Sequence, residues 1–219
     1  MAARPRAKPA APDHAADTLL IVANGVLSFL NMARLRSPEK RSAILEAAAH
    51  EIAESGIGAP TAKIARRAGL AEGTLFTYFV NKDELLNALY LQLKSEIYQH
   101  LVANFPHKAG LEHRAWHIWS SYCAWAIRFP AKRKTAAQLK VSGLITAVTR
   151  AATAAESGPV DATLCELEQR EAFRGLPPGF ASATMGAMHE ATLEFIAQRP
   201  GERKKLIRRS FLLFWRACR

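Results

Sequence analysis

The sequence has few of the features that mark secreted, metal-binding or membrane-spanning proteins. Its 219 residues include only three cysteines, Cys123, Cys165 and Cys218, which lie far apart and form no Cys-x-x-Cys pair. This spacing excludes a disulfide framework and a zinc finger, so we expect free thiols in a reducing compartment. The longest apolar run, 18–30, is interrupted by polar residues and is shorter than the about 20 residues that span a bilayer.

Signatures of catalysis are also missing. The sequence contains no Ser/His/Asp motif, no Gly-rich phosphate loop and no Cys-His signature. His113 and His117 have a spacing that can bind a metal on a helix, but no cysteine or further histidine follows nearby to complete a site, so we interpret them as surface histidines. We therefore predict that the protein is not an enzyme and holds no metal or cofactor.

No segment alternates between apolar and polar residues with β-branched enrichment, so we predict an all-α fold. Helix N-caps, glycines and prolines divide the chain into segments. Ser37 and Asn81 are typical N-caps, and Gly56 is typical of a helix end. The predicted helices cover residues 37–55, 61–68, 71–79, 82–101, 111–129, 131–154, 160–173, 179–198 and 202–217.

The first 36 residues have three interpretations. Residues 1–17 are rich in alanine, proline and basic residues, which is typical of a disordered tail. A secretory signal peptide is a second interpretation, although no Ala-x-Ala cleavage site follows the apolar stretch. The third is that Met32 is the true start. We divide the chain into this extension (1–36), a helix-turn-helix head (37–82) and a helical body (83–219).

Residues 60–82, PTAKIARRAGLAEGTLFTYFVNK, read as two short helices joined by a tight turn, which is the helix-turn-helix arrangement. We expect Thr61 to cap the first helix and Gly69 to allow the turn. Leu75 and Phe79 are four residues apart and should face the core. The side chains on the other side of the second helix would then face outward, where such a helix meets DNA base edges.

Residues 40–90 resemble the DNA-binding domain of TetR-family transcriptional regulators over about a quarter of the chain. The matching pieces are Ile44-Leu45-x-Ala47-Ala48, Pro60-Thr61-x-x-Ile64-Ala65, Ala68-Gly69-Leu70-x-x-Gly73-Thr74-Leu75-Phe76-x-Tyr78-Phe79 and Asn81-Lys82-x-x-Leu85-Leu86. The resemblance implies a cytoplasmic homodimer that binds a palindrome-like DNA operator and, through a helical ligand-binding and dimerisation domain, a small organic effector. The function implied is a ligand-responsive repressor, without a cofactor.

Carried over by position, the residues expected to contact DNA are Thr61, Glu72, Gly73, Thr74, Thr77, Tyr78 and Lys82. Two positions depart from the family pattern. Phe76 stands where the family often has tyrosine, and Ala62 lacks the polar group that some members use. These departures favour an alternative, a helical interaction protein that keeps the fold without reading DNA. A third interpretation is peripheral membrane association through residues 18–30 and their basic flanks.

The body is rich in aromatic residues, which is typical either of an effector cavity or of an ordinary core. Candidates that place polar groups among apolar neighbours are Trp119, Cys123, Gln138, Ser142 and His189. The resemblance implies that the last two helices form the dimer interface. The apolar residues in 202–217 cover more than one helix face, which favours burial against both the body and a partner.

Net charge is a weak guide to the DNA-binding region. The chain carries +11, but the head (37–82) has six basic and five acidic residues, whereas residues 199–219 have eight basic and one acidic. The DNA-binding prediction therefore depends on the motif rather than on the charge.

Overall fold

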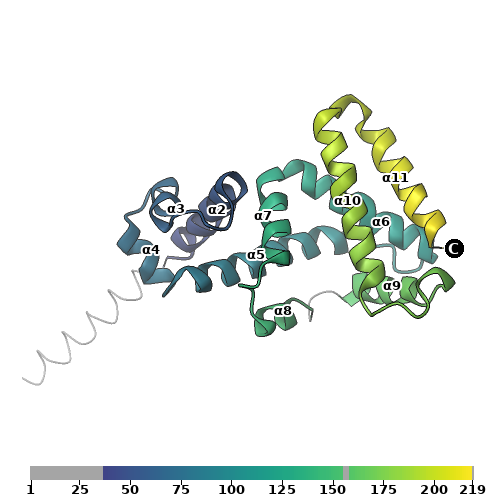
Figure 1. Ribbon diagram of the computed structural model, residues 1–219, viewed down its shortest axis with the longest axis horizontal. Helices are drawn as coiled ribbons and strands as arrows, with labels where there is room; N and C mark the ends of the chain where they lie inside the picture. Colours follow the sequence, from purple (N-terminus) through teal and green to yellow (C-terminus); the bar gives the residue numbers. More distant parts are fainter. Residues whose placement is uncertain (1–36, 155–157, 219) are drawn as a thin grey trace, which may run out of the picture. The chain divides into compact units, whose positions relative to one another are not determined.

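The computed structural model describes residues 37–154 and 158–218, which are helical with short connections (Figure 1). Of the described residues, 37–43 fall in one compact unit of the chain and the others in a second. The predictions about the N-terminal tail, Met32 and residues 18–30 fall outside the described residues. Within them, the predicted all-α fold is confirmed.

The head is built from three helices and the start of a fourth: α2 (Pro38–Ser55), α3 (Thr61–Arg67), α4 (Glu72–Tyr78) and α5 (Lys82–Val102). Ser37 caps α2, because its hydroxyl accepts a hydrogen bond from the Lys40 amide at 3.2 Å. Helix α2 is followed directly by Gly56, whose φ of +79° is readily adopted only by glycine.

Asn81 caps α5 as predicted. Its side-chain oxygen accepts from the Glu84 amide at 2.8 Å. The Glu84 carboxylate reaches back and accepts from the Val80 amide at 2.6 Å. This resembles a capping box with the return bond moved by one residue, and it satisfies two amides at the helix start.

The body comprises α6 (Leu111–Arg128), α7 (Pro130–Val141), α8 (Ala147–Ala154), α9 (Gly158–Glu168), η1 (Glu171–Phe173), α10 (Phe180–Gln198), η2 (Pro200–Glu202) and α11 (Arg203–Ala217). The prediction of one helix over 131–154 is wrong, because the chain leaves the helix between α7 and α8. Asn87 of α5 stabilises this break: its amide donates to the Leu144 carbonyl, and its oxygen accepts from the Thr146 amide, both at 3.0 Å.

Two apolar cores lie along the chain. The first packs α2, α3, α4 and the first half of α5, and also takes in Leu139 and Ile145 from the body. The second packs α6, α9, α10 and α11 around the end of α5. Helix α5 contributes to both, with Leu93 in the first core and Ile97 in the second. The proposed boundary between residues 82 and 83 remains a prediction.

Two further observations concern membrane-spanning and disulfide-bonded proteins, the classes that the sequence argues against. The helices of the described part of the chain are too short or too polar to cross a membrane. The thiols are free as predicted: Cys123 and Cys218 are buried, and Cys165 is exposed.

Candidate nucleic-acid interface and body pocket

The turn between α3 and α4 has the geometry that the motif predicts. Gly69 adopts a φ of +71°, in the left-handed region that favours glycine. The next amide, that of Leu70, donates to the Ala65 carbonyl at 2.9 Å and closes the turn. Ile64, Ala65 and Leu75 are fully buried beneath it. The core therefore fixes α4 with its opposite side toward solvent.

Thr61 does not cap α3, so that prediction is wrong. Pro60 occupies the N-cap position without a side-chain hydrogen bond, and Thr61 is the first helical residue. Its hydroxyl instead donates to the Glu72 carboxylate at 2.6 Å, which joins the starts of α3 and α4. Two of the predicted DNA contacts thus pair with each other in the free protein.

The other predicted residues of α4 lie on its outer side. Gly73 and Thr77 are exposed, whereas Thr74 and Tyr78 are half-buried. The Thr77 hydroxyl donates to the Thr74 carbonyl at 2.7 Å, so its lone pairs remain for a base donor. A Cβ added at Gly73 would meet no atom within 4 Å. The packing of the protein therefore does not require glycine here.

Sequence reasoning missed three exposed side chains on this surface. Phe76 is 42% exposed on α4, and a phenylalanine ring can contact the methyl group of thymine. Its position next to the buried Leu75 was the signal that it points outward. Lys63 and Arg66 are exposed on α3 and carry charge that suits phosphate contacts.

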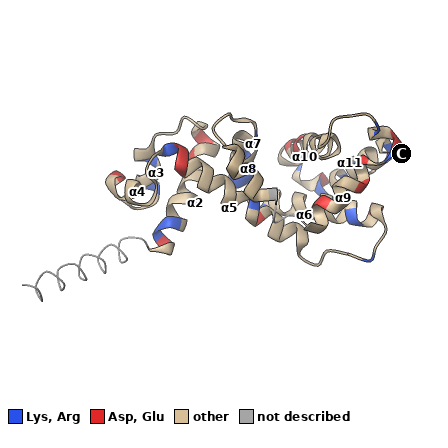
Figure 2. Ribbon diagram, turned by 90° about the horizontal axis from the view of Figure 1, so that it is seen from below, with Lys and Arg blue, Asp and Glu red and all other residues tan. Residues whose placement is uncertain are grey.

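Other cations of the head are already engaged. The Lys82 ammonium donates to the Ala59 carbonyl at 2.8 Å and is half-buried at the start of α5. Arg67 binds Glu51 at 2.7 Å and Glu54 at 2.6 Å. Figure 2 shows basic and acidic residues interspersed along the helices. Lys63 and Arg66 are therefore better placed than Lys82 or Arg67 to contact phosphate.

Three of the five effector candidates come together in the second core. The ring centroids of Trp119 and His189 lie 4.1 Å apart, and Cys123 is buried in the same core. The His189 ring nitrogen donates to the Trp119 carbonyl at 3.3 Å. Burial lowers the pKa of His189 to about 3, so the ring is neutral at physiological pH. Burial also raises the pKa of Cys123 to about 12, which makes it a poor nucleophile.

The other two candidates lie elsewhere, so the five do not form one site. The Gln138 amide donates to the Ile52 carbonyl of α2 at 3.4 Å. The Ser142 hydroxyl donates to the Leu139 carbonyl at 3.0 Å, in the turn after α7. Both residues pack beside the first core rather than the second.

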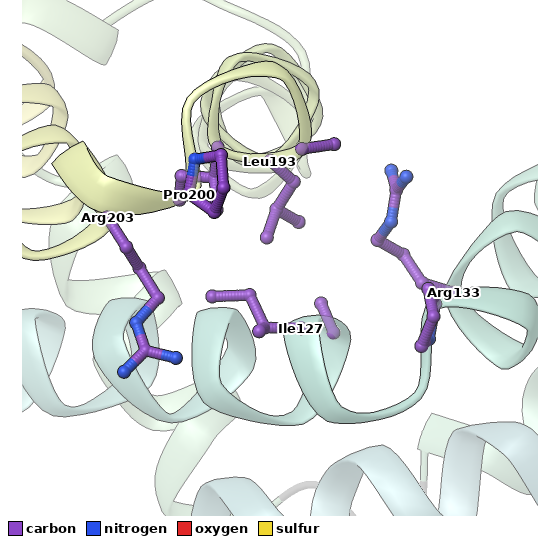
Figure 3. Close-up of a pocket in the computed structure, with 9 residues that line it drawn as sticks. Ile127, Arg133, Leu193, Pro200 and Arg203 are labelled. Carbon is purple, nitrogen blue, oxygen red and sulfur yellow. The ribbon is translucent and has the colours of Figure 1, made fainter.

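A pocket of about 240 Å³ lies between α6, α7, α10 and the start of α11 (Figure 3). None of the five candidates lines it. Its lining residues are Ala126, Ile127, Pro130, Arg133, Leu193, Ile196, Ala197, Pro200 and Arg203. Sequence reasoning missed this pocket because its residues come from two stretches of the chain, 126–133 and 193–203, which lie about 60 residues apart in sequence.

The histidine pair is not arranged as a metal site. His113 is exposed, whereas His117 is half-buried and its ring contacts the Leu101 carbonyl at 3.0 Å. The interpretation of His117 as a plain surface histidine was therefore wrong. Among the residues that the structure describes, no group of three or more His, Cys, Asp or Glu side chains could hold a metal.

Comparison with known proteins supports the helix-turn-helix assignment. Residues 44–89 match the profile described as "Bacterial regulatory proteins, tetR family". The fatty acid metabolism regulator protein of Bacillus subtilis is 34% identical over 67 residues, which is 30% of this chain and 34% of that protein. The chain thus spans about a third of the length of this relative.

Solved structures extend the similarity over the body. A tetR-family transcription regulator from Shewanella sp. PV-4 is 26% identical with a TM-score of 0.69, covering 83% of this chain and 98% of that one. The TetR-like regulator LfrR from Mycobacterium smegmatis, solved in complex with proflavine, is 18% identical with a TM-score of 0.60, covering 80% and 95% of the two chains. Residues 44–89 therefore match the DNA-binding domain of the tetR family of bacterial regulatory proteins, and the described residues share the fold of tetR-family regulators.

Proposed function

We propose that this protein is a homodimeric, sequence-specific DNA-binding repressor whose helical body binds a small organic effector. The match of residues 44–89 to a family of bacterial regulatory proteins supports this function over an enzymatic one. The observation that carries the proposal is the fixed orientation of α4, whose inner side is locked into the first core while Gly73, Phe76 and Thr77 face outward. A protein that acts on chromosomal DNA in this way would be located in the cytoplasm.

In the proposed complex, α4 enters the major groove of the operator. Phe76 contacts a thymine methyl, and Thr77 accepts from a donor on a base edge. Gly73 lets the DNA backbone approach closely. Lys63 and Arg66 contact phosphate from α3, and Thr61 does so after releasing Glu72, which is then able to accept from a cytosine. Thr74, Tyr78 and Lys82 support this surface from its edges.

The proposed dimer interface lies mainly on α10. Its exposed side carries Phe180, Ala183, Ala187, Ala191 and Phe195 at helical spacing, and small residues let two such helices pack closely. Most of the large apolar residues of α11 are instead covered by the body of the same chain: Phe211, Phe214 and Trp215 are buried. Leu213 is 63% exposed and can extend the interface.

The effector part of the proposal depends on the body. LfrR, which has the same fold, was solved in complex with proflavine, and this supports the binding of a small organic effector by this chain. The pocket between α6, α7 and α10 offers such a site.

The DNA-binding proposal can be tested with duplexes selected from a random DNA pool by the full-length protein. Fluorescence anisotropy then compares a selected duplex with a scrambled one. We expect a preference of at least about 10³-fold. Phe76→Ala should weaken binding to the selected duplex about tenfold. Leu144→Ala is the matched control, because Leu144 is also 42% exposed but lies outside the head.

Equal affinity for selected and scrambled duplexes would contradict the proposal. It would favour the alternative, a helical interaction protein that attracts DNA only through charge.

A further inference from the structure

The pocket between α6, α7, α10 and the start of α11 combines apolar walls with two arginines. We propose that it binds a small amphipathic organic monoanion, whose apolar body lies between Ile127 and Leu193 and whose carboxylate meets Arg203. This inference names the chemical class of effector for the proposed regulator. The claim that the ligand changes DNA binding rests on the proposed function. The claim that the ligand binds here rests only on the pocket.

The floor of the pocket suits a hydrocarbon body. Ile127 of α6 and Leu193 of α10 point toward each other across it (Figure 3). Ala126, Ile196 and Pro130 complete the apolar wall. At about 240 Å³, the pocket is smaller than the roughly 300–1,000 Å³ of sites for drug-sized ligands. A short chain or a single ring therefore fits better than a large aromatic system.

The charged side chains at the pocket favour a ligand that carries one negative charge. Arg133 is paired with Glu190, which also accepts from the Tyr122 hydroxyl at 3.3 Å. In the described part of the chain, the Arg203 guanidinium has no hydrogen bond or ion pair and is exposed at the start of α11. Two arginines and one glutamate leave one unbalanced positive charge. A carboxylate neutralises it, and the guanidinium fork can bind it through two hydrogen bonds.

Arg133 and Arg203 flank the apolar floor from opposite sides (Figure 3). Because Glu190 holds Arg133, that side chain closes one end of the pocket in a fixed position. Arg203 is free to turn toward a ligand at the other end. An organic cation of the same shape would meet two guanidinium groups and would be repelled.

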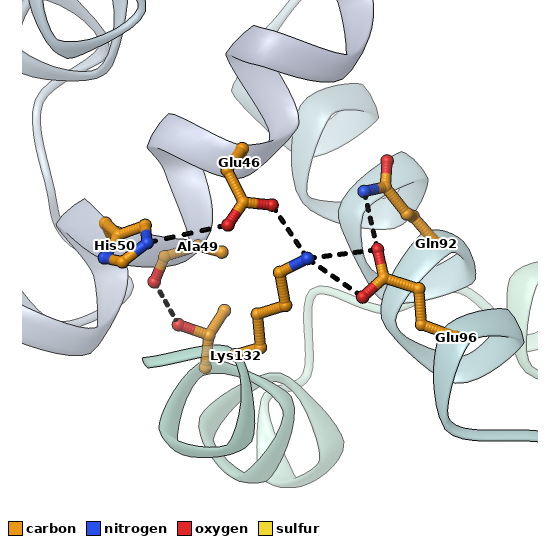
Figure 4. Close-up of polar contacts among 7 residues, drawn as sticks. Glu46, Ala49, His50, Gln92, Glu96 and Lys132 are labelled. Carbon is orange, nitrogen blue, oxygen red and sulfur yellow. Dashed lines mark hydrogen bonds and ion pairs between the residues drawn. The ribbon is translucent and has the colours of Figure 1, made fainter. Parts of the chain in front are cut away.

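Helix α7 lines the pocket and also contacts the head. Pro130 and Arg133 in the first turn of α7 line the pocket. Between them, Lys132 binds Glu46 of α2 at 2.8 Å and Glu96 of α5 at 3.0 Å (Figure 4). One turn later, the buried Thr135 hydroxyl donates to the Ala49 carbonyl of α2 at 2.6 Å. A ligand that displaces the first turn of α7 would thus act on the helix that supports the DNA-binding motif.

The binding test uses isothermal titration calorimetry of the full-length protein without DNA. The probes are sodium octanoate, octylammonium chloride and 1-octanol, which share one chain and differ in charge. We expect octanoate to bind at least tenfold more tightly than octylammonium. Arg203→Gln should weaken octanoate binding about tenfold and leave octanol unchanged. Lys204→Gln removes the same charge from the adjacent exposed residue, which does not line the pocket, and should change neither.

A second variant tests the location. Ala197 is exposed and lines the pocket, so Ala197→Phe should fill the pocket, abolish octanoate binding and leave the melting temperature within about 2 °C of the parent. Undetectable octanoate binding to the parent protein, equal affinity for the three probes, or unchanged octanoate binding by Arg203→Gln or Ala197→Phe would overturn the proposal.

The regulatory part is measured separately, as the affinity for a selected duplex with and without octanoate. We expect octanoate to lower this affinity at least tenfold. In Arg203→Gln, octanoate should lower the DNA affinity less than it does in the parent. Octanoate binding that leaves DNA affinity unchanged would overturn the coupling through α7 and leave the site in place. A protein that prefers no DNA sequence would overturn the proposed function, whereas the binding site would still be judged by calorimetry alone.

Discussion

His189 is a buried imidazole that the protein keeps neutral. It is 4% exposed, and its ring lies 4.1 Å from that of Trp119 and 4.6 Å from that of Tyr122. Burial lowers its pKa from 6.5 to about 3. Because the unfolded chain takes up this proton near pH 6.5 and the folded protein does not, the stabilisation is complete above pH 6.5 and is lost as the pH falls toward 3.

Replacing His189 by glutamine should therefore flatten the pH dependence of stability. The free energy of unfolding of the parent should fall by roughly 2 kcal/mol more than that of His189→Gln between pH 7 and pH 5. Urea unfolding at a series of pH values measures this difference. His113→Gln, which changes an exposed histidine, should keep the slope of the parent. Parallel curves for the parent and His189→Gln would show that this residue is not the source of the pH dependence.

Helix α5 connects the two cores, and the Asn81 cap fixes where it begins. The cap side chain and Glu84 together satisfy two backbone amides. Helix α5 supplies Leu85, Leu86 and Leu89 to the first core. A shifted start of α5 would therefore displace the apolar side chains of the core on which α4 packs.

Asn81→Ala should lower the free energy of unfolding by about 1 kcal/mol, because it leaves the Glu84 amide without its acceptor. Asn81→Asp keeps an acceptor at the same place and should remain within roughly 0.5 kcal/mol of the parent. Guanidinium unfolding followed by circular dichroism compares the three proteins. If the alanine and aspartate variants were equally stable, the hydrogen bond to Glu84 would not support the helix.

Over the full chain, the distribution of charge and apolar surface separates DNA binding from self-association. The basic residues near the C-terminus do not belong to the head, and Lys204, Arg208 and Arg209 are exposed on α11. The exposed small and aromatic residues instead lie along α10. We therefore expect two copies to meet along α10, with the charges of α11 at the edge of the interface.

Ala187→Asp should disrupt this dimer, because it buries an unpaired carboxylate at the centre of the α10 interface. We expect a shift from dimer to monomer in sedimentation velocity and at least a tenfold loss of affinity for a selected palindromic duplex. Ala152→Asp, at an exposed position of α8, is the matched control. A dimeric Ala187→Asp protein would place the interface elsewhere.

Much of the fold could be predicted because its signals are local. Ser37, Gly56, Gly69 and Asn81 mark helix ends through their own backbone and side-chain chemistry, and the structure places them there. The break between α7 and α8 was missed although Gly143 lies in it. Asn87, more than 50 residues earlier in the chain, supplies its hydrogen bonds.

The same distinction between local and long-range signals applies to the candidate sites. The outward face of α4 follows from the spacing of Leu75 and Phe79, which is a property of the helix alone. The pairing of Thr61 with Glu72, and of Lys82 with the Ala59 carbonyl, depends on how separate segments meet. For this reason, sequence spacing identified the outward surface of α4, which we propose faces DNA, but not which of its polar groups already have partners within the protein.

The sequence by itself determined most of the helices, the helix-turn-helix motif and the resemblance to the tetR family, because caps, turns and helical periodicity act within a few residues. Only the tertiary structure decided which body residues surround a cavity. It separated Gln138 and Ser142 from Trp119, Cys123 and His189, and it brought Ile127, Leu193 and Arg203 to one pocket. The physical reason is that a cavity is bounded by side chains from distant helices, whose relative positions depend on the packing of the whole core.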